Sequence, residues 1–345
     1  MKIVHICPID KFIPSFVDCV NNNFNSEEHV FWIFGRSDIF DIKDNHNVKY
    51  IGASKFAKLK TITELIIDAN KSDKVIFHSF LGAKLAAIFF FMPWIMSKCY
   101  WFIWGGDLYS FKAKRNLRWY LKEAFRRPVI KRMGYLVTYV QGDYELAKEW
   151  YGCKGHFLEC LMYTSNVYNH VELDKKNNDE TVMILGNSAD PTNNHIDALK
   201  RIEIFKDENI RVIVPLSYGD KKYAVKVIAE GQRLLGAKFQ PITDFMPYEK
   251  YLELLSTVDV AIFNHDRQQA MGNTISLLGL KKTVFINRNT TQWRLFEAKG
   301  IKVLDMREFT LEYIDDEQKK VNSERIKEYF SHENLIKQLK VIFDL

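Results

Sequence analysis

The sequence lacks the short motifs that identify several large enzyme classes. It contains no GxGxxG, no GxxxxGK[ST] and no GxSxG, which argues against dehydrogenases, P-loop enzymes and serine hydrolases. No Asp-x-Asp pair occurs either, so the usual carboxylate ligands of a metal–diphosphate complex are missing. We therefore expect no metal and no cofactor, and a bound diphosphate would have to be met by cationic side chains and helix N-termini.

Paired cysteines and long apolar runs are also missing. The 5 cysteines form no CxxC pair and are odd in number, so we expect free thiols in a reducing cytoplasm and no zinc site. We expect no signal peptide, because the apolar run 3–7 leads straight into Pro8 and predicts a buried strand. Pro93 and Lys98 interrupt the apolar stretch that starts at 85, short of the roughly 20 residues of a membrane span. The stretch instead predicts a buried helix over 83–91 and a buried strand over 100–104.

Positive charge is concentrated in one segment. Between residues 111 and 132 there are nine Lys or Arg and one Glu. The net charge of this segment is therefore +8, that of the remainder is −2, and that of the whole chain is +6. Aromatic residues precede it, and the combination favours an anionic membrane surface over nucleic acid, for which we find no motif. A solvated basic helix without a partner is the alternative. The candidate membrane-binding residues are Lys112, Lys114, Arg115, Arg118, Arg126, Arg127, Lys131 and Arg132.

Strand-like and helix-like stretches alternate along the whole chain, which predicts an α/β fold with parallel, doubly wound sheets. The length of 345 residues suits two domains. We expect an N-terminal Rossmann-like domain over 1–175, a second over 181–315 with a cleft between the two, and a helical segment over 316–345 that crosses back to the first. Predicted strands lie at 3–7, 30–34, 48–51, 75–77, 100–104, 136–139, 182–185, 212–215, 238–240, 260–263, 283–286 and 302–304. Predicted helices lie at 12–23, 61–70, 83–91, 194–205, 221–235, 248–257, 273–280 and 316–343.

Polar segments follow the strands of the second half, where such sheets bind ligands. After the strand 182–185, a polar turn leads into a helix N-terminus, an arrangement that binds anions. After 260–263, an arginine offers a bidentate phosphate donor and a Gly-Asn-Thr helix start offers a second anion site. A solvated loop is the alternative for this last segment. The candidate residues for binding a nucleotide-sugar donor are Gly186, Asn187, Ser188, His195, Tyr218, Arg267, Gln268, Gln269, Gly272, Asn273 and Thr274.

Two residues behind strands of the first half are candidate bases. Asp107 follows the Gly105-Gly106 turn and can accept a proton or bind acceptor hydroxyls, with a helix N-cap as the alternative. His78 follows the strand 75–77 and can act as a base, with a hydrogen-bonded structural histidine as the alternative. We take Asp107 as the first choice and His78 as the second.

Five blocks of the chain are similar to one enzyme family. WFIWGGDLY (101–109), ILGNSADPTNNHIDAL (184–199), VIVPLSYGD (212–220), RQQAMGNTISLL (267–278) and FINRNTTQW (285–293) resemble the TDP-4-acetamido-4,6-dideoxygalactose (TDP-Fuc4NAc) transferases of enterobacterial common antigen synthesis, glycosyltransferase family 56. The resemblance implies a GT-B fold and a peripheral enzyme on the cytoplasmic face of the inner membrane. It also implies a TDP-sugar donor and an undecaprenyl-diphosphate-linked saccharide acceptor.

The sequence thus predicts a metal-independent glycosyltransferase that moves a deoxyamino sugar from TDP or UDP to a lipid-linked saccharide of enterobacterial common antigen or O-antigen. Two alternatives stay open. One is a GT-B-like nucleotide-sugar epimerase, which would turn over donor without acceptor. The other is a non-catalytic sugar-nucleotide-binding subunit of a polysaccharide assembly complex.

Overall fold

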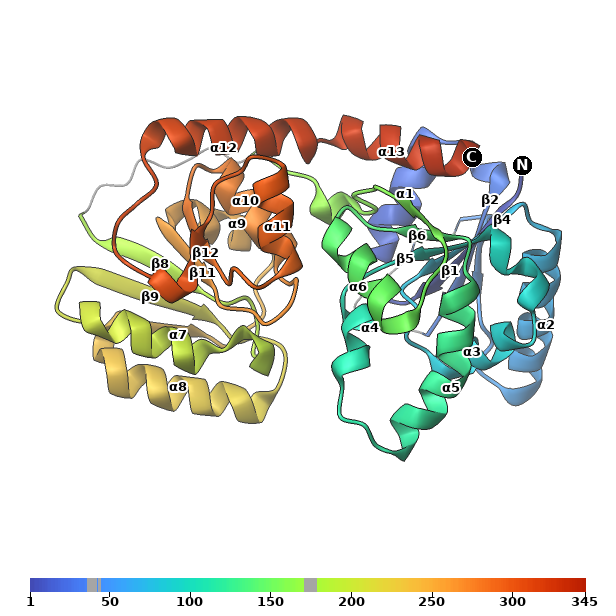
Figure 1. The fold of residues 1–345 in the computed structure, drawn as a ribbon, viewed down its shortest axis with the longest axis horizontal. Helices are drawn as coiled ribbons and strands as arrows, with labels where there is room; N and C mark the ends of the chain where they lie inside the picture. The colour runs from blue at the N-terminus through green and yellow to red at the C-terminus, as the bar shows by residue number, and fades with distance from the viewer. Residues whose placement is uncertain (36–41, 43–44, 171–178) are drawn as a thin grey trace. The chain divides into compact units, whose positions relative to one another are not determined.

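The chain forms two compact units, each built on its own parallel sheet. The computed structural model describes residues 1–35, 42, 45–170 and 179–345. The first unit comprises Met1–Ser165 and His332–Leu345, and the second comprises Asn166–Ser331 (Figure 1). Residues 171–178, which hold most of the expected boundary between 175 and 181, lie outside the described residues.

The first unit has a seven-stranded sheet whose strands pair in parallel in the order β3-β2-β1-β4-β5-β6-β7. The strand order reverses between β1 and β4, which is the point where sheets of this kind bind ligands at the carboxyl ends of the strands. The strands are β1 (Ile3–Pro8), β2 (His29–Phe34), β3 (Val48–Tyr50), β4 (Lys74–His78), β5 (Cys99–Phe102), β6 (Tyr135–Val137) and β7 (His156–Leu158).

Helices cover both faces of this sheet because alternate strand residues point to opposite sides. Val4 and Ile6 of β1 pack with α2, α3, α5 and α6, whereas His5 faces α1 and α13. Figure 1 shows α3 beside α5. The helices of the unit are α1 (Ile13–Asn23), α2 (Lys55–Lys71), α3 (Ala83–Phe90), α4 (Gly106–Tyr109), α5 (Leu117–Arg132), α6 (Gln141–Tyr151) and α13 (His332–Asp344).

The second unit repeats the plan with a six-stranded parallel sheet in the order β10-β9-β8-β11-β12-β13. Its strands are β8 (Thr181–Leu185), β9 (Ile210–Pro215), β10 (Phe239–Ile242), β11 (Val260–Phe263), β12 (Thr283–Ile286) and β13 (Leu304–Asp305). Its helices are α7 (His195–Ile202), α8 (Lys221–Leu235), α9 (Tyr248–Thr257), α10 (Met271–Gly279), α11 (Thr291–Ala298) and α12 (Asp316–Tyr329).

The predicted strands are confirmed to within one or two residues, because most of them are short runs of buried apolar residues. The sequence missed helix α6 and strand β7, whose three residues are exposed or half-buried. It also missed α11, whose polar start at Thr290 caps the helix by accepting from Trp293 N at 3.3 Å. The helix expected over 316–343 is two helices, with a break at Phe330-Ser331. The first belongs to the second unit and the other to the first unit.

The apolar stretch after residue 83 forms helix α3 and, after a 3-10 turn, the buried strand β5, but α3 buries only Ala86 and Phe89 and is not the buried helix that was expected. Within the part of the chain that the structure describes, no helix has the length and apolar character of a membrane span. The five cysteines are free and buried. Among the same described residues, no group of three or more His, Cys, Asp or Glu is arranged to hold a metal ion.

Candidate donor site and the matching edge of the first unit

The carboxyl ends of three adjacent strands bring most of the candidate donor-binding residues together in the second unit. Strand β8 lies between β9 and β11, so the segments that follow them meet at one edge. They are joined by hydrogen bonds: Ala189 N donates to Tyr218 O at 2.7 Å, and Asp266 N donates to Thr192 O at 3.1 Å. Three loops that are distant in sequence therefore form one connected surface.

Asn193 holds this edge from beneath and was not among the residues singled out from the sequence. Its side chain is buried, and its Oδ1 accepts from Asn187 N at 3.0 Å and from His265 Nε2 at 2.9 Å. Its Nδ2 donates to the backbone oxygen of Asp190 at 3.1 Å. Position 193 lies in a polar run whose sequence does not distinguish an inward from an outward side chain, so only the packing identifies it.

Two buried histidines lie under the first turn. Burial lowers the pKa of His195 to about 4 and the pKa of His265 to about 3, the latter also because His195 and Arg267 are close. Both imidazoles are therefore neutral at pH 7. In the described part of the chain, neither ring nitrogen of His195 has a hydrogen-bond partner, nor has Nδ1 of His265. His195 thus lies beneath the edge, where it supports the turn.

Gly186 is required at the turn above His195. Its φ is +69°, a conformation that L side chains rarely adopt, and a Cβ there would lie 2.4 Å from His195 Nε2. Ser188 is also turned inward: it is 2% exposed, and its Oγ accepts from Asp190 N at 3.4 Å. The backbone of this turn is consequently the part that a ligand can approach.

The outer rim carries the amide and hydroxyl groups. Asn187 Nδ2 donates to Tyr218 Oη at 3.1 Å, and Gln269 Nε2 donates to Asn187 Oδ1 at 3.3 Å. Tyr218 is 49% exposed. The structure therefore brings Asn187, Tyr218 and Gln269 together as a polar, half-open group able to bind hydroxyls or a base edge, and Gln268 lies half-buried next to it.

Arg267 provides the positive charge of this edge. A guanidinium nitrogen lies 3.7 Å from a carboxylate oxygen of Asp190, which is farther than a hydrogen bond. Another donates to the backbone oxygen of Gln268 at 3.3 Å. This loose ion pair leaves donor capacity for an anion.

Helix α10 begins at the same edge. Ala270, in the left-handed region with φ 55°, precedes it, and the backbone groups of Met271–Asn273 come before the first intrahelical bond, from Thr274 N to Ala270 O. The side chain of Asn273 donates to Tyr251 Oη at 2.8 Å, and the buried Thr274 Oγ1 donates to Ala270 O at 3.0 Å. The helix start therefore offers a ligand the backbone N–H groups of Met271, Gly272 and Asn273 rather than the side chains of Asn273 and Thr274.

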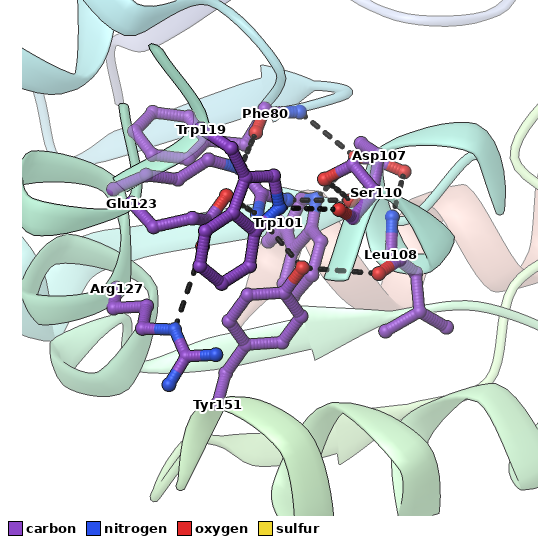
Figure 2. A network of polar contacts seen from close by, with 10 residues as sticks. Phe80, Trp101, Asp107, Leu108, Ser110, Trp119, Glu123, Arg127 and Tyr151 are labelled. Atoms are coloured by element: carbon purple, nitrogen blue, oxygen red, sulfur yellow. Dashed lines mark hydrogen bonds and ion pairs between the residues drawn. The ribbon is translucent and has the colours of Figure 1, made fainter. Parts of the chain in front are cut away.

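Asp107, at the corresponding edge of the first unit, is a fully engaged structural carboxylate. It is 1% exposed. One oxygen accepts from the backbone N–H groups of Trp104 and Leu108, both at 3.0 Å. The other accepts from Phe80 N at 2.8 Å and Trp101 Nε1 at 2.6 Å (Figure 2). The expectation of a general base at Asp107 does not fit this arrangement, because four N–H donors already occupy its oxygens.

Arg126 belongs to the same network and not to a membrane-facing surface. It is 0% exposed, and its guanidinium donates to Phe80 O, Asp107 O, Glu123 and Tyr151 Oη. This corrects the expectation that it binds lipid, because a buried, fully paired cation is inaccessible to a surface. Arg127 is half-exposed beside Glu123 at 3.6 Å. The remaining cations of the set are exposed: Lys112, Lys114, Arg115, Arg118, Lys131 and Arg132.

His78 is the middle of a buried chain of hydrogen bonds. Its Nδ1 lies 2.6 Å from Tyr163 Oη, and its Nε2 lies 3.1 Å from His5 Nδ1. His5 Nε2 in turn lies 2.9 Å from His29 Nδ1. Burial lowers the pKa of His78 to about 3, so the ring is neutral at pH 7 with both nitrogens engaged. This is the structural alternative rather than an available base.

Two α/β units, each built on its own parallel sheet, are the architecture of the GT-B fold. The chain belongs to the family described as 4-alpha-L-fucosyltransferase, glycosyl transferase group 56, whose model matches residues 11–339. It is therefore a glycosyltransferase enzyme.

Solved GT-B structures are similar over nearly their whole length. Anabaena HepE in complex with UDP is 11% identical, with complete coverage of both chains and a TM-score of 0.69. The UDP-forming α,α-trehalose-phosphate synthase of Burkholderia xenovorans is 8% identical, with 100% of this chain and 98% of that one covered and a TM-score of 0.68. WaaG, a glycosyltransferase involved in lipopolysaccharide biosynthesis, is 11% identical, with 98% of each chain covered and a TM-score of 0.62. At these identities the likeness concerns the fold alone.

Proposed function

We propose that this enzyme transfers a deoxyamino sugar, 4-acetamido-4,6-dideoxygalactose or a close relative, from a TDP-sugar or UDP-sugar donor. The acceptor is an undecaprenyl-diphosphate-linked saccharide of enterobacterial common antigen or O-antigen synthesis. The observation that carries the proposal is the edge of the second unit, where Arg267, the start of α10 and the Gly186 turn converge. The UDP bound to HepE supports a nucleoside diphosphate as the donor carrier.

The donor diphosphate is bound by charge and by backbone N–H groups in this proposal. Arg267 pairs with a phosphate oxygen and gives up its loose contact with Asp190, while the first turn of α10 donates its N–H groups. Gly186 lets the backbone approach the ligand. Asn187, Tyr218 and Gln269 bind sugar hydroxyls or the base.

Catalysis consists chiefly of stabilising the departing nucleoside diphosphate, whose charge grows in the transition state. Donors fixed before the reaction stabilise that charge most effectively in a site from which water is excluded. The first unit binds the acceptor. There Asp107 is a positioning residue, which fixes the turn after β5 through its four accepted hydrogen bonds.

Attachment to the cytoplasmic face of the inner membrane brings the enzyme to a lipid-linked acceptor. Arg127 and the six exposed cations of the 112–132 segment support this part of the proposal, since each Lys or Arg near an anionic membrane contributes about 1 kcal/mol.

The first test is a thermal-shift panel of TDP, UDP, GDP and CMP, each measured with and without EDTA. A transfer assay follows. We expect TDP or UDP to raise the melting temperature selectively, with or without EDTA, because a ligand that binds only the folded state stabilises it. The assay follows radiolabelled TDP-sugar with and without lipid-linked saccharide. Conversion of the donor without acceptor would indicate an epimerase. Nucleotide binding without turnover under either condition would indicate a non-catalytic subunit. No shift with any nucleotide would contradict the donor site.

A further inference from the structure

Helix α5 has apolar side chains on its outer side as well as on the face that packs in the core. Glu123 and Arg126 lie on its buried face, whereas Leu117, Tyr120 and Leu121 are 74%, 55% and 58% exposed. The exposed positions are spaced by three and four residues, so they share one side of the helix, and the exposed Ala124 continues it. The apolar stripe of this helix therefore points away from the protein.

The two charged residues on the buried face of α5 have a cause in the packing. The carbonyl groups of Phe80 and Asp107 need a buried donor, and Arg126 supplies it from the inner face of α5. Glu123 neutralises that guanidinium at 3.0 Å. The inner face thus combines this polar pair with the buried Trp119, Val129 and Ile130, and the leucines on the outer face lie outside the core.

The apolar stripe extends onto α3. Phe90 contacts Phe125 of α5 with ring centroids 5.4 Å apart, and the next residue, Phe91, is 69% exposed. The exposed Phe91 thus directly follows a residue that packs on α5, and it adds one more exposed apolar side chain to this unit.

A basic groove follows the stripe along the same helix. It has a volume of about 970 Å³ and is lined by Arg127, Lys131 and Arg132 of α5 together with Lys154 and His156. No acidic residue lines it. The outer side of α5 thus presents apolar side chains in its first half and a cationic groove in its second half, over the roughly 24 Å of a 16-residue helix.

We infer that the outer face of α5, with Phe91, docks on an anionic phospholipid bilayer. Leu117, Tyr120 and Leu121 insert among the headgroups, and the groove binds lipid phosphate. Apolar side chains beside Lys and Arg on one helix face are the pattern of a helix that lies in the membrane interface. The inference rests on the proposed function, because a lipid-linked acceptor gives the enzyme a reason to be there, and it extends that proposal by naming an inserting apolar surface.

The test is flotation of the full chain with vesicles of phosphatidylcholine containing 30% phosphatidylglycerol, over a series of salt concentrations. We expect Leu117→Ser/Leu121→Ser to lower the partition coefficient at least tenfold at every salt concentration, since apolar burial is not screened. Lys131→Gln/Arg132→Gln should lower it at least tenfold at low salt and flatten the salt dependence. The matched control is Ile204→Ser/Val225→Ser, which removes side chains 74% and 67% exposed in the second unit and should not change binding.

Melting temperatures equal to that of the unaltered chain establish that each variant is folded. Equal flotation of the Leu117/Leu121 variant and the unaltered chain overturns the inference, as does equal loss in the control. Preferential binding of RNA or DNA over these vesicles overturns it in favour of a nucleic-acid surface. If the unaltered chain floats in a Leu117-dependent way but transfers sugar to no acceptor, the proposed function fails and the docking surface stands.

Discussion

Both units have polar groups near the carboxyl edge of their sheets, yet these groups do different things. In the first unit Asp107 and Arg126 are buried, and hydrogen bonds engage both carboxylate oxygens and the whole guanidinium. In the second unit Arg267 and Tyr218 are partly exposed, and Arg267 has only a distant ion pair and one backbone contact.

The difference shows that the position after a strand does not define a ligand site. A polar group at a carboxyl edge either forms hydrogen bonds within the protein or remains able to form them with a ligand. In the first unit the network closes the turn after β5 and stabilises the fold. In the second unit the buried Asn193 supports the loops from below, and the amide and hydroxyl groups of the rim stay partly exposed.

Asp107→Asn should have the largest effect, on stability. The new amide nitrogen would face N–H donors and the buried negative charge would be lost, so the free energy of unfolding should fall by about 3 kcal/mol or more. Urea unfolding measures this. Asp316→Asn, whose side chain is 98% exposed, is the control and should change it by less than about 0.5 kcal/mol. A stable Asp107→Asn protein with abolished transfer would restore Asp107 as the base.

Arg267→Ala should have the next largest effect, on catalysis. Loss of one fixed donor to the departing diphosphate should lower kcat about a hundredfold, or roughly 2.7 kcal/mol, while the melting temperature is unchanged. Steady-state kinetics of sugar transfer measure it. Arg233→Ala removes a side chain that is 61% exposed on α8 and should be neutral. Near-normal turnover of the Arg267 variant would remove this residue from the site.

Acid should lower the free energy of unfolding of both units, and the effect of each buried histidine should be smaller than the two effects above. Burial holds the pKa of His78 and of His265 at about 3, below the unfolded value of 6.5. The unfolded chain therefore binds more protons below pH 6.5, so stability is complete above that pH and falls toward the folded pKa. The loss between pH 7 and pH 5 should be about 2 kcal/mol for each buried imidazole.

Variants of these two histidines sharpen the comparison. His265→Gln should flatten the pH dependence and keep stability at pH 7, because its amide can donate to Asn193 as Nε2 does. His78→Gln should lose stability at every pH, because one amide does not replace both ring contacts. Equal stability of the His78 and His265 variants at pH 7 would contradict the predicted difference between the two histidines.

The sequence indicated the architecture because strands buried on both faces read as short apolar runs between helix-like stretches. It also indicated the edge of the second unit, since Asn187, Tyr218, Arg267 and Gln269 all follow such runs. It missed Asn193, because a buried asparagine in a polar loop looks like its exposed neighbours. It grouped Arg126 with Arg127 because charge counting does not distinguish a buried arginine from a half-exposed one next to it on a helix.

The sequence by itself determined two parallel-sheet units, the strands within them and the family, because apolar periodicity and ordered motif blocks are properties of the chain alone. Only the tertiary structure decided which polar groups remain available. Whether Asp107 accepts a substrate proton or four N–H groups depends on Phe80, Trp101 and Trp104 coming close to it in space. A buried polar group without a hydrogen bond costs free energy, so buried groups such as Asp107 are paired within the protein. Polar groups that stay partly exposed remain able to bind a ligand.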